Sequence, residues 1–516
     1  MDRLRLAELL AGLSLVADLG MGLEPGEAGR AALVAVGLAD SVGAEEPGDV
    51  FYTALLQHVG CTGFAHEAAA LLGGDEIAVK RAAVRTDFGD PRDVVRTYLP
   101  HLAPAATVAT RLRAAGTAAV RARAIVEGYS RANCEVAARM AERLGLGEGV
   151  RSALGQIYEQ WDGGGGPRGL RGDAIAEPAR IAQVAATAAL FHREGGVEAA
   201  VAAVRRRAGA ALDPRVAETL ARRGGAILGV LDGADPLEAA VAAEPEPHVG
   251  VSDAGLDRVC RAFGEAVDLK TPLHHGHATG VAALAAAAGG RAGLGTAEIA
   301  GLRRAALVHD LGRAAVPNGI WACPGPLTWG ERERVRLHAY HSERVLARCG
   351  PLAALAPLAG MHHERLDGSG YHRQATAPAL SLAARVLAAA DAFQAMTQPR
   401  AHRPARTPAE AAALLADDAR AGRLDPDAVR AVLEAAGERP GVLRRERPAG
   451  LTERQIEVLR LLAQGLSNRR IAERLVISPR TAERHVQDVY ARIGVSSRAA
   501  AALFAMEHDL LARQDW

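Results

Sequence analysis

The stretch AEIAGLRRAALVHDLG, residues 297–312, joins a helix pattern to two side chains that bind metals. Its apolar residues recur at helical spacing and Gly312 stands near its end, so the stretch predicts a helix that stops close to that glycine. His309 and Asp310 then lie in the C-terminal part of the helix. Because adjacent helical residues point about 100° apart, the two side chains can reach different sides of a metal cluster.

Further histidines and aspartates flank this pair on both sides. Imidazole nitrogens and carboxylate oxygens are the ligands that hold Zn, Fe, Mn or Ni in proteins. Seven such groups are too many for one ion and suit two, and Asp310 can bridge two cations because it has two oxygens. We therefore predict a site for two metal ions. Its predicted ligands are His277, His309, Asp310, His338, His362, His363 and Asp391.

The composition predicts an all-α protein. A chain of 516 residues is roughly three domains' worth of sequence. Hydrophobic residues make up 49% but aromatic residues only 3%, so the cores consist mainly of Ala, Leu and Val. Ala and Leu are strong helix formers, and no sustained β-branched alternation is present. The net charge of +1 means that overall electrostatics predict neither nucleic-acid nor membrane binding.

The cysteines and the N-terminal region indicate a reducing compartment. The five cysteines are widely spaced without a CxxC pair, which argues against a disulfide framework or a zinc ribbon. The first 20 residues carry Glu8 and Asp18 within an apolar run that is too short and interrupted for a signal peptide or a membrane span. We expect a soluble cytoplasmic protein that does not bind a membrane.

Two breaks divide the sequence. Glu and Pro alternate from Glu244 to Pro247, and proline disfavours helix in the residue before it. The stretch GERPGVLRRERPAG, residues 437–450, mixes Gly, Pro and Arg without apolar periodicity. The predicted domains are 1–235, 250–436 and 450–516, with linkers at 236–249 and 437–449.

The first two segments look like copies of each other. QIYEQWDGGGGPRG, residues 156–169, matches MHHERLDGSGYHRQ, residues 361–374, with a shift of 205. TALLQHVG, residues 53–60, matches AALVHDLG, residues 305–312, with a shift of 252. The larger shift predicts an insertion in the first copy between its two matched blocks.

The first copy has lost every metal ligand that can be aligned. Gln57 and His58 stand in place of His309 and Asp310, Asn133 in place of His338, Ile157 and Tyr158 in place of His362 and His363, and Ala186 in place of Asp391. A duplicated fold can keep its core and lose its chemistry, because function depends on the site. We expect no metal pair in the first copy, and a role in packing, dimerisation or sensing.

The second copy resembles the HD-GYP branch of the HD phosphohydrolases. The resemblance rests on His277 and then on VHDLGR (308–313), LHAYHSERVL (337–346), HHERLDGSGYH (362–372), ADAFQAMTQPRAHR (390–403) and LDP (424–426). It implies an all-α HD domain that hydrolyses a phosphodiester, typically a cyclic dinucleotide such as cyclic di-GMP. It also implies two divalent ions, usually Fe or Mn, with Ni, Zn or Mg as alternatives.

The resemblance also implies roles for residues around the ligands. Asp310 and Arg313 are implied as catalytic. Arg313 stands where the family has a lysine, and it keeps the positive charge but cannot give up a proton as lysine can. Substrate contacts are implied for Tyr371 and His372 of the signature Gly370-Tyr371-His372, where the family has proline in the last place, and for Arg400 and Arg403.

Two further departures concern the metals and the residues beside them. Gln394 stands in place of a second aspartate that usually follows the metal-binding one. Leu273 stands where some family members have a glutamate that supplies a third metal. We therefore expect two ions.

The last segment predicts four short helices and DNA binding. Thr452 with Gln455, Ser467, and Ser478 followed by Pro479 are helix-start signals. The turn VISP, residues 476–479, gives helix-turn-helix spacing. The segment 451–505 resembles the LuxR-type helix-turn-helix, which implies DNA as a partner; we also expect a homodimer. The predicted DNA contacts are Arg480, Thr481, Arg484 and His485, with Arg469 and Arg470 on phosphates.

Three functions fit these observations. The leading hypothesis is a transcription regulator whose HD-GYP-like domain hydrolyses a nucleotide phosphodiester. A sensor that binds a nucleotide without useful turnover is favoured by Arg313, His372 and the altered first copy. An HD-fold di-iron oxygenase would use nearly the same ligands, but the adjacent pair His362 and His363 with the following DGSGY favours the phosphodiesterase branch.

Overall fold

The computed structural model describes residues 4–102, 108–233, 235–437, 448–508 and 510. Within these ranges the chain forms helices and turns, and the extended backbone is limited to isolated bridges, which confirms the all-α prediction. Contacts divide the chain into two compact units: Met1–Val259 with Pro317–Gly319 and Cys349–Pro351, and Cys260–Val316 with Ile320–Arg348 and Leu352–Trp516. A search of the described helices for a membrane-crossing segment finds none of sufficient length and hydropathy.

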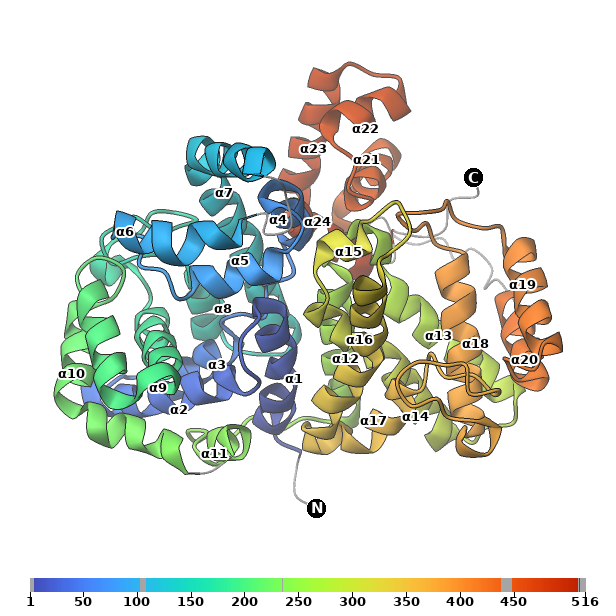
Figure 1. Ribbon diagram of the computed structural model, residues 1–516, viewed down its shortest axis with the longest axis horizontal. Coiled ribbons are helices and arrows are strands. Elements are labelled where there is room, and N and C mark those ends of the chain that lie inside the picture. Colours follow the sequence, from blue (N-terminus) through green and yellow to red (C-terminus); the bar gives the residue numbers. More distant parts are fainter. Residues whose placement is uncertain (1–3, 103–107, 234, 438–447, 509, 511–516) are drawn as a thin grey trace. The chain divides into compact units, whose positions relative to one another are not determined.

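The first unit contains the first copy, and α2 packs against α3, α9 and α10 at its centre (Figure 1). Its core is built from Ala, Leu and Val, as the composition predicts. The helices are α1 (Leu6–Met21), α2 (Glu27–Val42), α3 (Pro47–Leu56), α4 (Ala65–Leu72), α5 (Glu76–Ala83), α6 (Pro91–Asp93), α7 (Val108–Arg143), α8 (Glu148–Leu154), α9 (Glu177–Arg207), α10 (Pro214–Leu228) and α11 (Pro236–Ala242). A π-helical turn lies at Val94–Tyr98, and 3₁₀ turns lie at Leu99–His101, Gly172–Ala174 and Gly229–Asp232.

The predicted linker 236–249 begins with a helix. α11 starts at Pro236, and the side chain of Asp235 accepts hydrogen bonds from the backbone N–H groups of Leu237 and Glu238 at 2.9 and 3.4 Å. Aspartate before proline is a strong helix start. The linker prediction rested on the later Glu–Pro alternation and did not include this helix. The other predicted linker, 437–449, lies mostly outside the described residues.

The second copy packs around α13, which contacts α14, α18 and α20 (Figure 1). The 3₁₀ turn Leu311–Ala315, which follows His309 and Asp310, packs against α16. The helices are α12 (Asp253–Asp268), α13 (His277–Arg291), α14 (Thr296–Val308), α15 (Asn318–Trp321), α16 (Trp329–Ala347), α17 (Ala356–Gly360), α18 (Leu382–Met396), α19 (Pro408–Arg420) and α20 (Pro426–Gly437). Further 3₁₀ turns lie at Pro272–His274, Gly350–Leu355 and Ala377–Ala379.

The C-terminal segment forms the four helices that the sequence predicts. They are α21 (Glu453–Ala463), α22 (Asn468–Leu475), α23 (Pro479–Ile493) and α24 (Arg498–Glu507), after a 3₁₀ turn at Pro448–Gly450. Thr452 and Gln455 form the expected capping box, and the hydroxyls of Ser467 and Ser478 cap α22 and α23. The turn between α22 and α23 completes a helix-turn-helix.

The duplication recurs in the contacts of the two copies. In the first copy, the carboxylate of Glu159 accepts hydrogen bonds from the backbone N–H groups of Arg168 and Leu170 at 2.7 and 2.9 Å. In the second copy, Glu364 accepts from Arg373 and Ala375 at 3.1 and 2.9 Å. All three positions are shifted by 205, so an equivalent buried glutamate orders the corresponding loop in each copy.

One further ion pair recurs at corresponding places in the two copies. Arg180 pairs with Asp213 at 2.7 Å, and Arg385 pairs with Asp425 at 2.9 Å. The predicted insertion in the first copy contains α4, α5 and α6 and the beginning of α7.

A close approach of backbone to backbone holds the His309–Asp310 turn against α16. A Cβ atom on Gly312 would lie 2.0 Å from the carbonyl oxygen of His338, and one on Gly60 would lie 2.1 Å from that of Asn133. These glycines and their partners are equivalent in the two copies, so this approach belongs to the shared fold.

Replacing Gly312 with alanine should therefore destabilise the second copy by about 3 kcal/mol, the upper range for overpacking a close contact. Gly290→Ala is a matched control, because Gly290 lies exposed in α13 and its nearest outside neighbour, a side-chain carbon of Ile299, is 3.8 Å away. The control should be neutral or stabilising by about 0.5 kcal/mol. Thermal unfolding followed by circular dichroism measures both, and equal melting temperatures for the two variants would contradict the close approach.

Candidate metal centre

Three helices, and the segments that follow two others, bring the seven predicted ligands together. His277 is the first residue of α13, His338 lies within α16 and Asp391 within α18. The pair His309–Asp310 follows α14 directly, and the pair His362–His363 lies just beyond α17. The ligand atoms form two groups, each within 4.8 Å: His338, His362 and His363 in one, and His277, His309, Asp310 and Asp391 in the other.

The carboxylate of Asp310 connects the two groups. Its Oδ2 lies 2.9 Å from Nε2 of His309 and 3.4 Å from Nε2 of His277. Its Oδ1 lies 3.1 Å from Nε2 of His338 and 3.4 Å from Nε2 of His362. Each oxygen therefore faces a different pair of histidines, which is the arrangement of a carboxylate that bridges two cations.

Asp391, on α18, contacts a histidine of each group. Its Oδ1 lies 3.1 Å from Nε2 of His277, and its Oδ2 lies 3.5 Å from Nδ1 of His363. Six of the seven ligands are at most 3% exposed, and only His363 is partly exposed. Among the seven ligands, His363 is therefore the one that lies nearest to solvent.

Three of the histidines are oriented by backbone carbonyl groups three residues earlier. Nδ1 of His309 lies 2.7 Å from the oxygen of Ala306, and Nδ1 of His362 lies 2.6 Å from that of Ala359. Nδ1 of His338 contacts the oxygen of Val335 in the same way. A carbonyl oxygen only accepts, so each Nδ1 carries a hydrogen, and each ring in its neutral form presents the lone pair of Nε2 to the centre.

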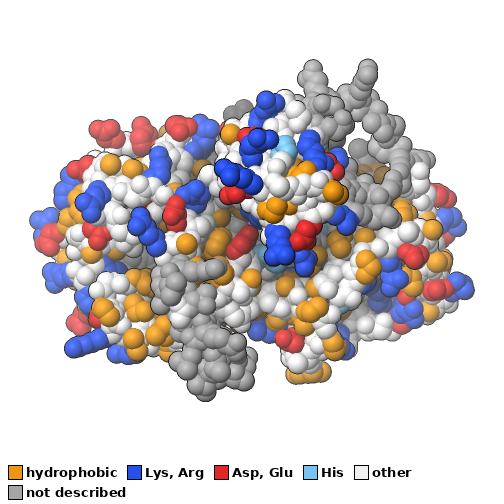
Figure 2. All heavy atoms as spheres, turned by 90° about the horizontal axis from the view of Figure 1, so that it is seen from above, with side chains coloured by type: hydrophobic (Ala, Val, Ile, Leu, Met, Phe, Trp, Pro, Cys, Tyr) orange, Lys and Arg blue, Asp and Glu red, His pale blue; other side chains and the backbone are white. Residues whose placement is uncertain are grey.

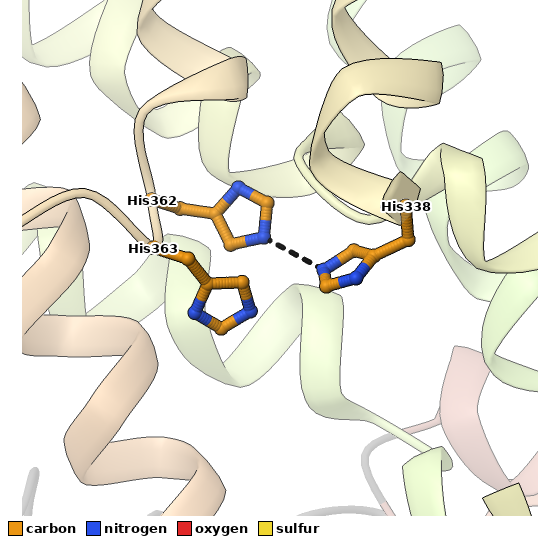
Figure 3. A group of neighbouring side chains, drawn as sticks. All are labelled: His338, His362 and His363. Atoms are coloured by element: carbon orange, nitrogen blue, oxygen red, sulfur yellow. Dashed lines mark hydrogen bonds between the residues drawn. The ribbon is translucent and has the colours of Figure 1, made fainter. Parts of the chain in front are cut away.

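The chemistry of the donor set fits metal ions. Nε2 of His338 and Nε2 of His362 face each other at 3.0 Å (Figure 3). With both Nδ1 atoms donating elsewhere, two lone pairs would meet there unless a proton or a cation lies between them. Nε2 of His309 and both oxygens of Asp310 are also buried without an aligned hydrogen bond to any described residue, although ion-pair distances connect them. Lone pairs that converge without aligned donors are what cation ligands require.

The two carboxylates stay ionised in spite of burial. Burial alone would favour the neutral acids, but Arg313 and His309 hold the pKa of Asp310 well below its usual range. His277 and His309 do the same for the pKa of Asp391. Two buried negative charges require positive charge nearby.

The histidines divide into two electrostatic types. Burial lowers the pKa of His338 and holds that of His363 well below its usual value, which keeps both rings neutral and able to act as ligands. Burial also opposes a charge on His309, but Asp310 and Asp391 outweigh it and raise the pKa of His309 to about 10. The carboxylates thus attract a cation at the position of His309.

Arg313 lies beside the centre, as the resemblance implies. Its Nη2 is 2.7 Å from Oδ2 of Asp310 and 3.4 Å from Nε2 of His277. The guanidinium also lies over the ring of Trp321, 5.5 Å from its centroid. Arg313 therefore supplies a fixed positive charge to the same carboxylate that faces both histidine groups.

The signature residues Tyr371 and His372 lie in different surroundings. The ring of Tyr371 lies against that of the ligand His363, with centroids 4.3 Å apart. The guanidinium of Arg336 lies over the ring of Tyr371, 5.3 Å from its centroid. Nε2 of His372 instead lies 3.2 Å from a carboxylate oxygen of Glu343. Tyr371 is therefore next to the centre, whereas His372 is held by an ion-pair partner on α16.

The two arginines also differ. Arg400 donates to the carbonyl oxygen of Leu273 at 2.8 Å and contacts Oε1 of Gln398, and burial lowers its pKa to about 9, with Arg313 adding to the effect. Arg403 donates to the carbonyl oxygens of Ala395 and Met396, at the end of α18, at 2.7 and 3.0 Å. These contacts give Arg403 a helix-capping role, so substrate contact by Arg403 stays a prediction.

Three contributors were missed from the sequence. Gln398 contacts the ligand His277 at 2.9 Å, Trp321 stacks on Arg313, and Glu364 orders the signature loop. Glu364 follows the two histidines directly and is matched by Glu159, and that duplication was a signal. Gln398 and Trp321 carry no pattern of their own, because their roles depend on tertiary neighbours.

The positions of the first copy that correspond to ligands are buried but chemically changed. Asn133 is 1% exposed, and Gln57 is buried as well. Burial lowers the pKa of His58 to about 4, and Tyr158 packs its ring against Tyr129 at 5.3 Å. Aromatic, amide and apolar groups occupy the place of the metal ligands.

The predicted DNA contacts lie on two helices of the C-terminal segment. Arg480 and Arg484 are exposed one turn apart on α23, while Thr481 and His485 are partly exposed. Arg469 and Arg470 are exposed on α22, where Arg469 pairs with Glu473 at 3.2 Å.

Comparison with known proteins assigns both parts of the chain. A family model described as "HD domain" matches residues 104–216 and 261–428. A second, described as "Bacterial regulatory proteins, luxR family", matches residues 449–505. The HD match falls on both copies, in agreement with the duplication.

Similar proteins include phosphodiesterases from two bacteria. The 3'3'-cGAMP-specific phosphodiesterase 3 of Vibrio cholerae is 28% identical over 435 residues, which cover 83% of this chain and 94% of that protein. A cyclic di-GMP phosphodiesterase of Pseudomonas aeruginosa is 37% identical over 137 residues, which cover 26% of this chain and 33% of that protein. A crystal structure of a cyclic GMP-AMP specific phosphodiesterase of V. cholerae is 24% identical, with a TM-score of 0.59 over 85% of this chain and 99% of that chain, and it supports the fold.

Replacing Asp310 with asparagine should lower the number of bound metal ions per chain. The side chain loses its negative charge, and one of its two oxygens becomes an amide nitrogen. Asp173→Asn is a suitable control, since Asp173 is an exposed carboxylate of the first copy. Elemental analysis of protein loaded with Mn²⁺ measures the stoichiometry. Equal metal content in the wild type and Asp310→Asn would contradict a bridging role.

Proposed function

The chain belongs to the HD domain family and carries a C-terminal LuxR-family domain, and from this premise we propose that it is a metal-dependent phosphodiesterase that regulates transcription. Its substrate is a cyclic dinucleotide or a related nucleotide phosphodiester. The observation that carries the proposal is Asp310, whose two oxygens face separate pairs of histidines. Similarity to phosphodiesterases of cyclic dinucleotides supports the substrate class.

The proposed ions would be held by the two groups of ligands around Asp310, with Fe or Mn as the metals. When bound, such a pair supplies the Lewis acidity that phosphodiester hydrolysis needs at neutral pH. The histidines keep their lone pairs directed to the centre because their other nitrogens donate to carbonyl oxygens. The buried surroundings strengthen each electrostatic contact.

Two arginines would bind the phosphate. Burial, and the repulsion between its charge and that of Arg313, lower the pKa of Arg400. An anionic phosphate between them would relieve this repulsion, and the charge that develops in the transition state would be stabilised further. Tyr371, stacked on His363, would contact the substrate at the partly exposed side.

A nucleotide sensor remains the second candidate, and Arg313 is the observation that favours it. Its guanidinium lies 2.7 Å from Asp310 and already offers that carboxylate one positive charge. If Arg313 keeps this contact with nucleotide bound, ligand binding would proceed without efficient hydrolysis. The turnover experiment separates the two functions.

DNA binding is proposed for the exposed arginines of α22 and α23. Basic and acidic side chains are mixed over the face in Figure 2, in keeping with the net charge of +1. Binding must therefore depend on a local group of basic residues within the helix-turn-helix, where α23 would enter the major groove. The segment is proposed to act as a homodimer.

The protein loaded with Mn²⁺ or Fe²⁺ should hydrolyse cyclic di-GMP or 3'3'-cGAMP to linear products, which chromatography detects. Arg400→Ala should lower kcat about 100-fold, as expected for loss of a group that stabilises transition-state charge, with metal content unchanged. Arg420→Ala, an exposed arginine of α19, should retain activity. Tight binding of both dinucleotides with no product would support the sensor instead.

Arg480→Ala and Arg484→Ala should each weaken binding to a mixed-sequence DNA duplex. Where the lost contact is to a phosphate, the slope of the logarithm of affinity against the logarithm of salt concentration should fall by about one. Arg430→Ala removes the same charge from an exposed site on α20 and should leave DNA binding unchanged. Fluorescence anisotropy at several salt concentrations measures both quantities. Wild-type affinity in both α23 variants would contradict the proposed face.

A further inference from the structure

His277 differs from the other buried histidine ligands in the group that orients it. His309, His338 and His362 each direct Nδ1 to the carbonyl oxygen three residues earlier. His277 is the first residue of α13, so α13 has no preceding turn of its own that could supply such a carbonyl. Its Nδ1 instead lies 2.9 Å from Oε1 of Gln398, two residues beyond the end of α18.

The neighbours of Gln398 identify the contacting atom as its carbonyl oxygen. Both terminal nitrogens of Arg400 approach the same Oε1, at 3.5 and 3.4 Å. Guanidinium nitrogens only donate, so the atom that they share with His277 must be an acceptor. Nδ1 of His277 therefore donates, and the lone pair of Nε2 faces Asp391 at 3.1 Å.

The first copy has an interacting pair at the same two positions. The side chain of Asp18 accepts from the backbone N–H of Ala28, and that of Asp268 accepts from Ala278, so this region is shifted by 250 and Glu27 corresponds to His277.

The equivalent of Gln398 follows from the other shift. The shift of 205, which relates Arg180 of α9 to Arg385 of α18, places Arg193 at the position of Gln398. Nε of Arg193 donates to Oε2 of Glu27 at 2.9 Å. The copy without metal ligands thus has a Glu–Arg ion pair where the other copy has His–Gln.

We propose that Gln398 is a positioning residue that fixes the orientation and tautomer of His277 for metal binding. Through the shared oxygen, it also holds Arg400 beside the centre. The inference rests on the proposed metal binding of the second copy. The first copy supports it, because both partners differ there and again form a complementary pair.

Gln398→Leu removes the acceptor at similar size, whereas Gln398→Glu keeps an acceptor for His277. The leucine variant should bind Mn²⁺ 10- to 100-fold more weakly, about the range for loss of an outer partner of a metal ligand. The glutamate variant should bind close to the wild type, and so should the control Gln464→Leu at an exposed position of the last segment. Titration calorimetry with Mn²⁺ measures the affinities.

Equal weakening in the leucine and glutamate variants, or none in the leucine variant, would overturn the inference. Failure of the wild type to bind Mn²⁺ would instead count against the proposed function. The pairing is tested separately on metal-free protein with His277→Glu, Gln398→Arg and the double variant. The double variant should melt above both single variants, because it recreates the Glu–Arg pair; a melting temperature at or below theirs would show that the two positions do not act as a pair.

Discussion

The two oxygens of Asp310 face two separate groups of histidines, and this division constrains the rest of the second copy. Each group needs side chains from different helices within a few ångströms, in a place from which water is largely excluded. Charges buried in this way are stable only with close partners. The approach of Gly312 to the backbone of His338, which the first copy shares, draws the turn that carries Asp310 onto the helix that carries His338.

The two copies separate the requirements of the fold from those of the site. Both keep the buried glutamate that orders the signature loop, the Arg–Asp pair and the close glycine contact. None of these groups is a metal ligand. The ligand positions have changed while this framework has remained, which illustrates that the helical arrangement is stable with either set of side chains.

The sequence predicted the helices well for a physical reason. Apolar periodicity and capping residues act locally, so Thr452 with Gln455 and Ser478 with Pro479 marked real helix starts. Metal ligands are recognisable by residue type. Asp235 was overlooked, although it is an equally local helix-start signal.

The roles of the surrounding side chains were less accessible to sequence reasoning. Arg403 caps a helix, His372 pairs with Glu343, and Gln398 contacts His277. Each role depends on which groups lie nearby after folding, and residue type alone carries no such information.

The two copies differ in how their buried charges are balanced. In the first copy, the Glu27–Arg193 pair balances its own charge without any ion. In the second copy, Arg313 lies beside Asp310, and His277 and His309 lie beside Asp391, so both buried carboxylates depend on positive charge from their neighbours. Bound cations would add contacts that exist only in the folded state, so the proposed metal binding would stabilise the second copy. The first copy, with a Glu–Arg ion pair at the corresponding positions, should not gain this stabilisation.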